Sequence, residues 1–117
     1  MNEGEQRMML DISKADWKLF RERLPEWQEA FMERLAREYI ALLSSEEPAS
    51  KKFWDLEKRI REDKRKPGVL LELRKSEVGW DLVRLLGDGV ITESDLEGFS
   101  GDLKDTVIHL AKTHSRI

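Results

Sequence analysis

A chain of 117 residues without cysteine and with a net charge of −3 excludes a disulfide framework, thiolate catalysis and cysteine-based metal sites. The length suits one domain with a modest core, and no run of 18 or more apolar residues predicts a membrane span. The N-terminal segment lacks the basic start and apolar middle of a signal peptide, so a cytoplasmic setting is expected.

The first residues carry no regular apolar pattern. Residues 1–12 are therefore predicted to form a flexible lead-in, and residues 13–117 a single helical domain. Within the lead-in, Leu10 and Ile12 are expected to touch the core. A helix can begin after Ser13, whose hydroxyl can cap it, and an acid three positions later completes a capping-box pattern.

A proline divides the first strongly helical stretch. Pro25 disfavours helical geometry at Leu24 and is welcome in the first turn of a helix, which predicts a break between two helices here. The second helix, residues 26–43, has the broadest apolar face in the sequence and is predicted to lie at the centre of a bundle. Its apolar positions include Trp27, Phe31, Met32, Leu35, Ala36, Tyr39, Ile40, Leu42 and Leu43.

The next helix carries an excess of positive charge. Residues 51–66 hold eight bases and four acids, a net charge of +4, so the rest of the chain sums to −7. Pro67 cannot continue the helix and Gly68 readily adopts a left-handed cap, which predicts its end. Bases have acids at helical spacing, and such pairs weaken the field of the segment. The expected pairs are Asp55 with Lys58 and Arg59, Glu57 with Arg61, and Glu62 with Lys66.

A narrow apolar stripe runs along this basic helix. Phe53, Leu56 and Ile60 recur at helical spacing and predict contact with the helix of residues 26–43. Trp54 lies about 100° round from Phe53, at the margin of the stripe. The bases expected to share the solvent side are Lys58, Arg61 and Arg65.

The last part of the chain predicts short helices separated by glycine turns. The apolar run at residues 69–73 has no strand to pair with and is expected to be extended or turn-like before a helix that begins near residue 75 or 76 and ends at residue 86. Thr92 opens a one- or two-turn helix with a capping box, and Ser100 begins a final helix. The predicted fold is therefore all-α, a single-domain bundle of five or six helices with negligible strand.

No catalytic or metal-binding motif emerges. Residues 88–96 are similar to the second half of an EF-hand calcium loop, but the first and third ligand positions fall on Arg84 and Leu86, which cannot bind calcium. His109 and His114 are five residues apart, not the four that a shared metal on one helix needs. No serine stands in a nucleophile motif. Neither enzyme activity nor a cofactor or metal is predicted.

Two stretches carry a resemblance to known proteins. LVRLLGDGVITESDLEGF is similar to the short C-terminal helical hairpins of bacterial proteins with a glycine-isoleucine-threonine-acid turn, which implies self-association. KKFWDLEKRIREDKRKPGV, together with the later DGVIT, DLEGFS and DLK segments, resembles small all-helical proteins of Gram-positive bacteria. That resemblance implies an all-helical fold and a cytoplasmic setting, and it carries no activity.

The sequence supports two hypotheses about function. The leading hypothesis is a small cytoplasmic protein-interaction module, with a homodimer as one form, that acts through an apolar patch near Trp54 or Trp80 and the charged helix. The alternative is a nucleic-acid-associated accessory protein that binds through the basic helix of residues 51–66, with Trp54 stacking on a base. No membrane partner is expected. The candidate interaction residues are Trp54, Trp80, Lys58, Arg61, Lys64 and Arg65.

Overall fold

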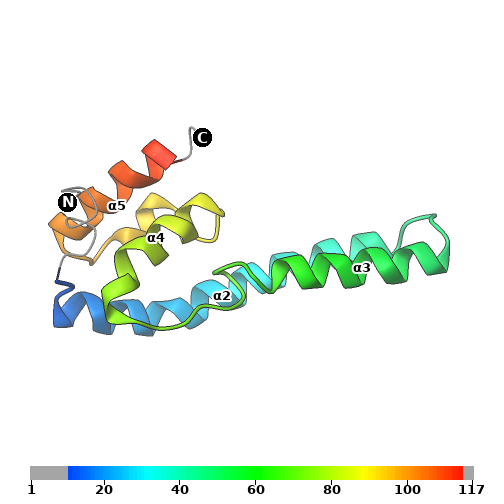
Figure 1. The fold of residues 1–117 in the computed structure, drawn as a ribbon, viewed down its shortest axis with the longest axis horizontal. Helices are drawn as coiled ribbons and strands as arrows, with labels where there is room; N and C mark the ends of the chain where they lie inside the picture. The colour runs from blue at the N-terminus through cyan, green and yellow to red at the C-terminus, as the bar shows by residue number, and fades with distance from the viewer. Residues whose placement is uncertain (1–10, 115–117) are drawn as a thin grey trace, which may run out of the picture.

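The computed structural model describes residues 11–114, in which helices are joined by turns and loops (Figure 1). The helices are α2 (Lys14–Leu43), α3 (Ala49–Asp63), η1 (Lys75–Glu77), α4 (Val78–Gly87), η2 (Glu93–Leu96) and α5 (Gly101–His114). The all-α prediction is confirmed, and no strand occurs between residues 11 and 114. The predicted count of five or six helices is not supported within this range, which holds four α-helices and two short 3-10 helices.

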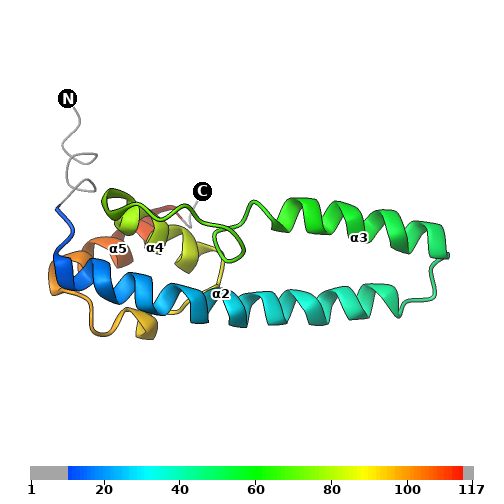
Figure 2. The ribbon, with the colours of Figure 1, turned by 90° about the horizontal axis from the view of Figure 1, so that it is seen from below.

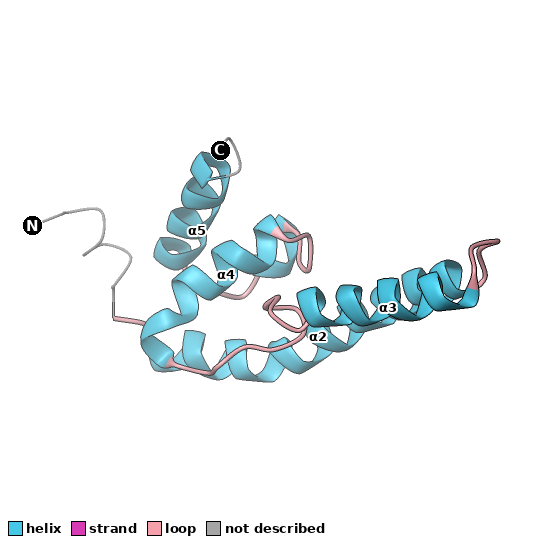
Figure 3. Ribbon diagram, turned by 45° about the vertical axis from the view of Figure 1, so that its right-hand side comes forward, coloured by secondary structure: helices cyan, strands magenta, loops and turns pink. Residues whose placement is uncertain are grey.

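Helix α2 runs the length of the molecule and gives it two unlike parts. Its first half packs against α4, α5 and η2 in a compact head, and its second half pairs with α3 in an arm that projects from the head (Figures 1 and 2). A tight loop closes the arm at its far end, and a long loop returns the chain to the head (Figure 3). The extents of 52 × 30 × 22 Å reflect this elongated shape, which the predicted bundle does not have.

The break predicted at Pro25 is absent, and α2 is one continuous helix through this residue. Proline inside a helix removes one backbone hydrogen bond and costs about 3 kcal/mol. Packing on both sides of Pro25 opposes that cost, because Phe20 and Leu24 are buried before it and Trp27 packs on the core after it. Pro25 and Arg21 are exposed, so the carbonyl left without a donor faces solvent. This continuity accounts for one of the missing helices.

The core lies in the head. The largest fully buried side chains are Phe20, Val78, Leu82, Leu85, Leu96 and Val107. The predicted central position of residues 26–43 is therefore wrong, since this stretch contributes only Phe31 and Leu35 to the buried part of α2. Ile12 is buried as expected, whereas Leu10 and most of the predicted lead-in lie outside the described residues.

Turn chemistry in the head follows the sequence closely. The Thr92 N–H donates to the Asp95 carboxylate at 2.7 Å, which confirms the capping box, although the helix it opens is the 3-10 helix η2. Gly98 ends this turn with a φ of 97°, a backbone conformation that favours glycine. Residues 70–74 form no helix or strand, and Arg74, in an extended conformation, leads into η1 and α4.

Two side chains of α2 fasten the base of the arm to its surroundings. The Gln28 amide donates to the Pro67 carbonyl at 2.9 Å, just beyond the end of α3. The Arg34 guanidinium donates to the Gly89 carbonyl at 2.8 Å, just beyond the end of α4. These hydrogen bonds join α2 to the chain segments that follow α3 and α4, so they hold the arm in a defined direction relative to the head.

Candidate functional site

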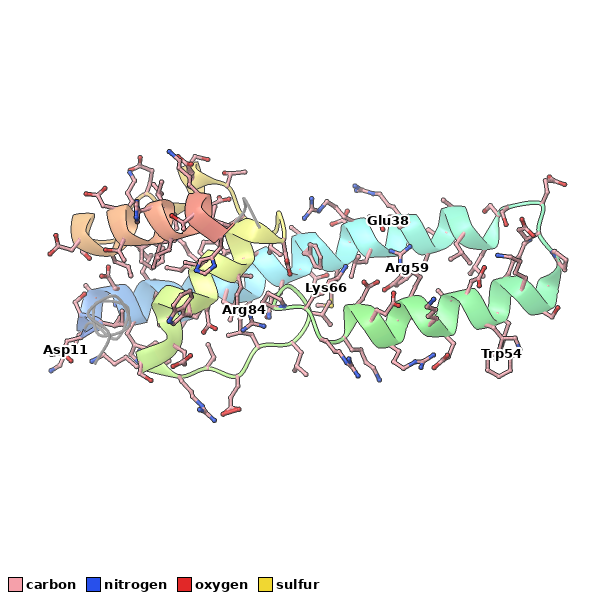
Figure 4. All side chains as sticks on the ribbon, turned by 45° about the horizontal axis from the view of Figure 1, so that its top comes forward. Asp11, Glu38, Trp54, Arg59, Lys66 and Arg84 are labelled. Atoms are coloured by element: carbon pink, nitrogen blue, oxygen red, sulfur yellow. The ribbon has the colours of Figure 1, made fainter. Side chains whose placement is uncertain are left out.

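The two helices of the arm are joined by a polar seam. The Tyr39 hydroxyl on α2 donates to the Asp63 carboxylate on α3 over 2.5 Å. The Arg59 guanidinium reaches back to Glu38 at 2.6 Å, and the Lys66 ammonium lies 3.0 Å from the second oxygen of Asp63 (Figure 4). Asp63 is almost fully buried. Charged and polar groups therefore occupy much of the surface that α3 turns toward α2.

The seam also sets the protonation of its central pair. Burial by itself raises the pKa of Asp63, but hydrogen bonds from Tyr39 and Lys66 and the charges of Lys66 and Arg59 outweigh it and hold that pKa below its usual value. Burial and then the hydrogen bond to Asp63 raise the pKa of Tyr39 to about 12. At neutral pH Asp63 is a charged acceptor and Tyr39 a neutral donor.

Apolar positions of the arm form two stripes. At about 100° per residue, positions spaced four, three and four apart share one face of a helix. A groove of about 310 Å³ is lined by Met32 and Tyr39 from α2 and by Ile60 from α3, so the two stripes lie on the same side of the arm. We name these eight residues the arm face: Met32, Ala36, Tyr39 and Leu43 on α2, with Ala49, Phe53, Leu56 and Ile60 on α3.

The arm face is largely open to solvent. Phe53 is 63% exposed, Leu43 46%, and Met32 and Ile60 39% each. Ile40, at the edge of the face, is 63% exposed. Single exposed apolar residues are ordinary on protein surfaces, but a contiguous group of large ones marks an interaction site. The arm face is therefore the first candidate site.

Helix α2 carries a separate apolar stripe for the head. Phe20, Leu24, Trp27 and Phe31 follow the same four-three-four spacing. The first three belong to or pack on the head core, and Phe31 is buried at the base of the arm. Met32 comes one residue later and so points about 100° away round the helix. One continuous helix thus turns one stripe to the head and a second, rotated stripe to solvent.

The prediction that Phe53, Leu56 and Ile60 form an inward stripe is wrong for Phe53 and Ile60, which are exposed. Leu56 alone is half-buried. The reason is that α3 turns Arg59 and Asp63 toward α2 to make the polar seam. The missed signal is that both helices share one spacing of alternating fours and threes, a pattern typical of helices that pack in bundles. Residues assigned to the core by sequence but found exposed are Met32, Ala36, Ile40 and Leu43.

A basic stripe follows the outer side of α3. Trp54, Lys58 and Arg61 have the same four-three-four spacing, which Arg65 continues just beyond the helix end. Trp54 is 63% exposed and points away from α2 (Figure 4). Its ring meets Phe53 edge-on, with the ring centroids 5.0 Å apart. Four of the six candidate interaction residues therefore share one side of the helix.

Ion pairs neutralise this stripe only in part. Arg61 pairs with Glu57 at 2.8 Å, as its spacing predicted. Asp55 pairs with Lys51 instead of with the bases that follow it. Such exposed pairs contribute little to stability or to screening. The bases without a carboxylate partner in the described part of the chain include Lys58, Lys64 and Arg65.

Trp80 lies apart from this stripe, at the base of the arm. It lines a cavity of about 630 Å³ beside the C-terminal ends of α4 and α5, and its ring meets His114 edge-on at 5.4 Å. Arg84, which Figure 4 labels, also borders this cavity. The remaining lining residues are Arg65, Lys66, Pro67, Val83, Gly87, Asp88 and Ala111. Of the predicted residues, the structure brings Trp80 together with Arg65 and separates it from Trp54.

The chemistry of this cavity opposes a strong anion site. Lys66 is already paired with the Asp63 carboxylate, and Arg84 lies 3.6 Å from Asp81. The cavity adjoins the last residues of α4 and α5, and the C-terminal end of a helix carries negative partial charge. The Asp88 carboxylate adds a further negative group. The arm therefore offers the stronger candidate surfaces.

Residues 11–114 contain no group of three or more histidine, aspartate or glutamate side chains placed to hold a metal ion. No helix within the same range combines the length and apolar character needed to cross a membrane. No family model matches the chain, and comparisons with curated proteins and with solved structures give no significant match.

Proposed function

We propose that this chain is a small protein-interaction module, without catalytic activity, that binds a protein through the arm face. The observation that carries this proposal is a pair of matched apolar stripes left open on adjacent helices. Stripes of this spacing stabilise helical bundles when a further helix covers them. The arm supplies two helices of such a bundle, and the binding protein would supply the rest.

The energy available at the arm face is large for so small a protein. Full burial of a Leu, Ile, Phe or Met side chain contributes about 1.5–3 kcal/mol. Covering the exposed fractions of Phe53, Leu43, Met32 and Ile60 would thus contribute roughly 3–6 kcal/mol. Whole domains of this size are stable by only about 5–15 kcal/mol. An exposed patch whose burial would contribute this much free energy supports a binding role.

The arm is also preorganised for binding. The Gln28 and Arg34 hydrogen bonds fix its base, and the Tyr39–Asp63 bond fixes the spacing of its helices. A surface that is already ordered loses less conformational entropy when it binds.

Site-specific crosslinking in living cells tests this proposal. A photoreactive amino acid at Phe53 should give a covalent protein adduct of defined mass, and the same group at exposed Glu93 in the head should not. Adding Ile60→Glu to the Phe53 crosslinker should abolish the adduct, because a charge in the centre of the arm face opposes burial. If position 53 gives no adduct, or position 93 gives the same one, the proposal is wrong.

A second function has support from the basic stripe. Trp54 is exposed beside Lys58 and Arg61, an arrangement suited to stacking on a base while lysine and arginine contact phosphates. Binding of a labelled oligonucleotide should then weaken steeply between low and physiological salt, and Lys58→Glu with Arg65→Glu should abolish it. Reversal of the exposed head bases Lys14 and Lys18 is the matched control. No binding of single- or double-stranded oligonucleotides at low salt would exclude this function.

A further inference from the structure

The arm face is bordered by opposite charges on its two helices. On α2, Leu35 faces the seam about 60° to one side of Met32, whereas Glu29 and Glu33 lie about 60° and 100° to the other side. The outer edge of α2 is therefore acidic along this stretch. Ile40 lies on the same edge, two turns further along.

The outer edge of α3 is basic by the same construction. Asp63 faces the seam about 60° to one side of Ile60, whereas Lys64 and Arg61 lie about 40° and 100° to the other side. Lys64 and Glu29 have no ion pair within the described residues, and the in-chain pairs of Glu33 and Arg61 are solvent-exposed. Exposed pairs of that kind are weak enough to exchange partners.

We propose that the protein bound at the arm face is a second copy of this chain, with α2 of each copy packed on α3 of the other. This inference rests on the proposed function and names its partner. A two-fold axis along the arm brings the acidic edge of one copy against the basic edge of the other, twice. An axis across the arm would instead stack α2 on α2 and α3 on α3, with like charges at both edges.

The spacing of the stripes fits this arrangement. Met32, Ala36, Tyr39 and Leu43 repeat at four, three and four, and the stripe on α3 repeats identically. Two hairpins with matching stripes form a four-helix bundle in which side chains of one layer enter the gaps of the other. Ala36 lies between the large residues Met32 and Tyr39 of its stripe, and Ala49 precedes Phe53, so small side chains leave gaps that large ones of the other layer can enter.

The size of the face predicts a reversible dimer. Helix α3 has 15 residues and is about 22 Å long, and two helices packed side by side span about 20 Å. The flat footprint is then roughly 440 Å² per copy, or about 880 Å² in total, which is below the range for stable specific interfaces and within that for weak, transient ones. The dimer should therefore dissociate on dilution in a measurable concentration range.

Sedimentation velocity with paired charge reversals tests the proposal. The wild-type mass should rise from 13.8 kDa toward twice that value with concentration. Glu29→Lys/Glu33→Lys alone and Arg61→Glu/Lys64→Glu alone should each weaken the dimer at least tenfold, since every edge contact then joins like charges. An equimolar mixture of the two variants should restore it, because the edges again carry opposite charges.

Each result of this experiment supports or overturns a stated part of the proposal. A wild-type chain that stays monomeric up to millimolar concentration overturns the proposal, as do variants that dimerise like the wild type. Failure of the mixture to restore the dimer overturns the pairing of α2 with α3. Glu93→Lys/Asp105→Lys, which changes exposed head acids, should leave the dimer intact, and circular dichroism confirms that each variant is folded.

The crosslinking experiment distinguishes this inference from the proposed function. An adduct at Phe53 with the mass of two copies supports both. An adduct of any other mass leaves the protein-interaction function standing and overturns the dimer. Absence of any adduct overturns both.

Discussion

Asp16, in the first turn of α2, accepts two hydrogen bonds from Ser100, one from the backbone N–H at 2.9 Å and one from the hydroxyl at 2.7 Å. The residues are 84 positions apart, and Ser100 immediately precedes α5. A buried carboxylate thus joins the beginnings of the first and last described helices. The capping-box pattern is half confirmed. The Ser13 hydroxyl accepts from the Asp16 N–H at 3.0 Å, but the Asp16 side chain accepts from Ser100 and not from the Ser13 N–H.

Replacement of Asp16 by alanine should destabilise the head by about 2–3 kcal/mol, because both hydrogen bonds to a charged acceptor are lost. Ser100→Ala keeps the backbone bond and should cost about 1 kcal/mol. Urea unfolding at neutral pH measures both. Asp11→Ala changes an exposed acid nearby and serves as the control. An Asp16→Ala effect no larger than the control would contradict the proposed tie between α2 and α5.

Tyr39→Phe removes the hydroxyl that bonds to buried Asp63 and should destabilise the protein by about 1–2 kcal/mol at neutral pH. The folded-state pKa of Asp63 lies below its usual value. Its stabilising contribution is therefore present above the unfolded-state pKa and is lost as pH falls through the folded-state value. The cost of Tyr39→Phe should shrink in acid, where the carboxyl group is protonated, and the pKa of Asp63 should rise.

Unfolding at neutral and acidic pH and NMR titration of the Asp63 carboxyl group test this prediction. Glu38→Gln alters only the exposed member of the Arg59 pair and should cost less than about 1 kcal/mol. An unchanged pKa of Asp63 in Tyr39→Phe would show that the hydroxyl does not stabilise the charged form.

Asp81 should lower stability as pH rises. Burial raises the pKa of this carboxyl group to about 6, with Glu77 adding to the effect and Arg84 opposing it. One oxygen of Asp81 has no hydrogen-bond partner among the described residues. Since the folded state holds its proton more tightly than the unfolded state, stability falls between the unfolded-state pKa and about pH 6.

Asp81→Asn should therefore raise the free energy of unfolding above pH 6 by up to about 3 kcal/mol and give little gain near pH 4. Thermal unfolding of both proteins across this range measures the difference. Glu77→Gln, at the half-buried end of η1, should give a much smaller change. Parallel pH profiles for wild type and Asp81→Asn would rule out Asp81 as the titrating group.

Gly68→Ala should destabilise the base of the arm by about 1–3 kcal/mol, because the space is already filled. An added Cβ would lie 2.8 Å from both the Phe31 ring and a Val90 methyl group, with a second ring atom closer still. Gly87→Ala is the matched control, since its Cβ would meet nothing within 4 Å. Urea unfolding of the two variants should differ in sign or clearly in size, and equal losses would contradict the close packing at Gly68.

Helix caps and the grouping of residues on helix faces could be predicted from the sequence. The Ser13 cap and the Thr92 capping box depend on near neighbours along the chain. The predicted end of the basic helix is wrong, since α3 ends at Asp63, before Pro67, and Gly68 does not adopt the left-handed cap geometry. The grouping of Lys58 and Arg61 on one side of α3 depends only on helical spacing. Such features do not require knowledge of what lies across the molecule, and the prediction of an all-helical chain follows from them.

Tertiary structure decided which apolar stripe is covered. Trp27 and Met32 belong to one broad apolar stretch in sequence, but the head covers only the stripe that ends at Phe31. Packing on both sides of Pro25 keeps α2 continuous, and the polar seam turns Phe53 outward. Burial depends on whether another element occupies the adjoining space, and no local pattern contains that information. The open arm face, on which the proposed function rests, is visible only once the head and the seam are in place.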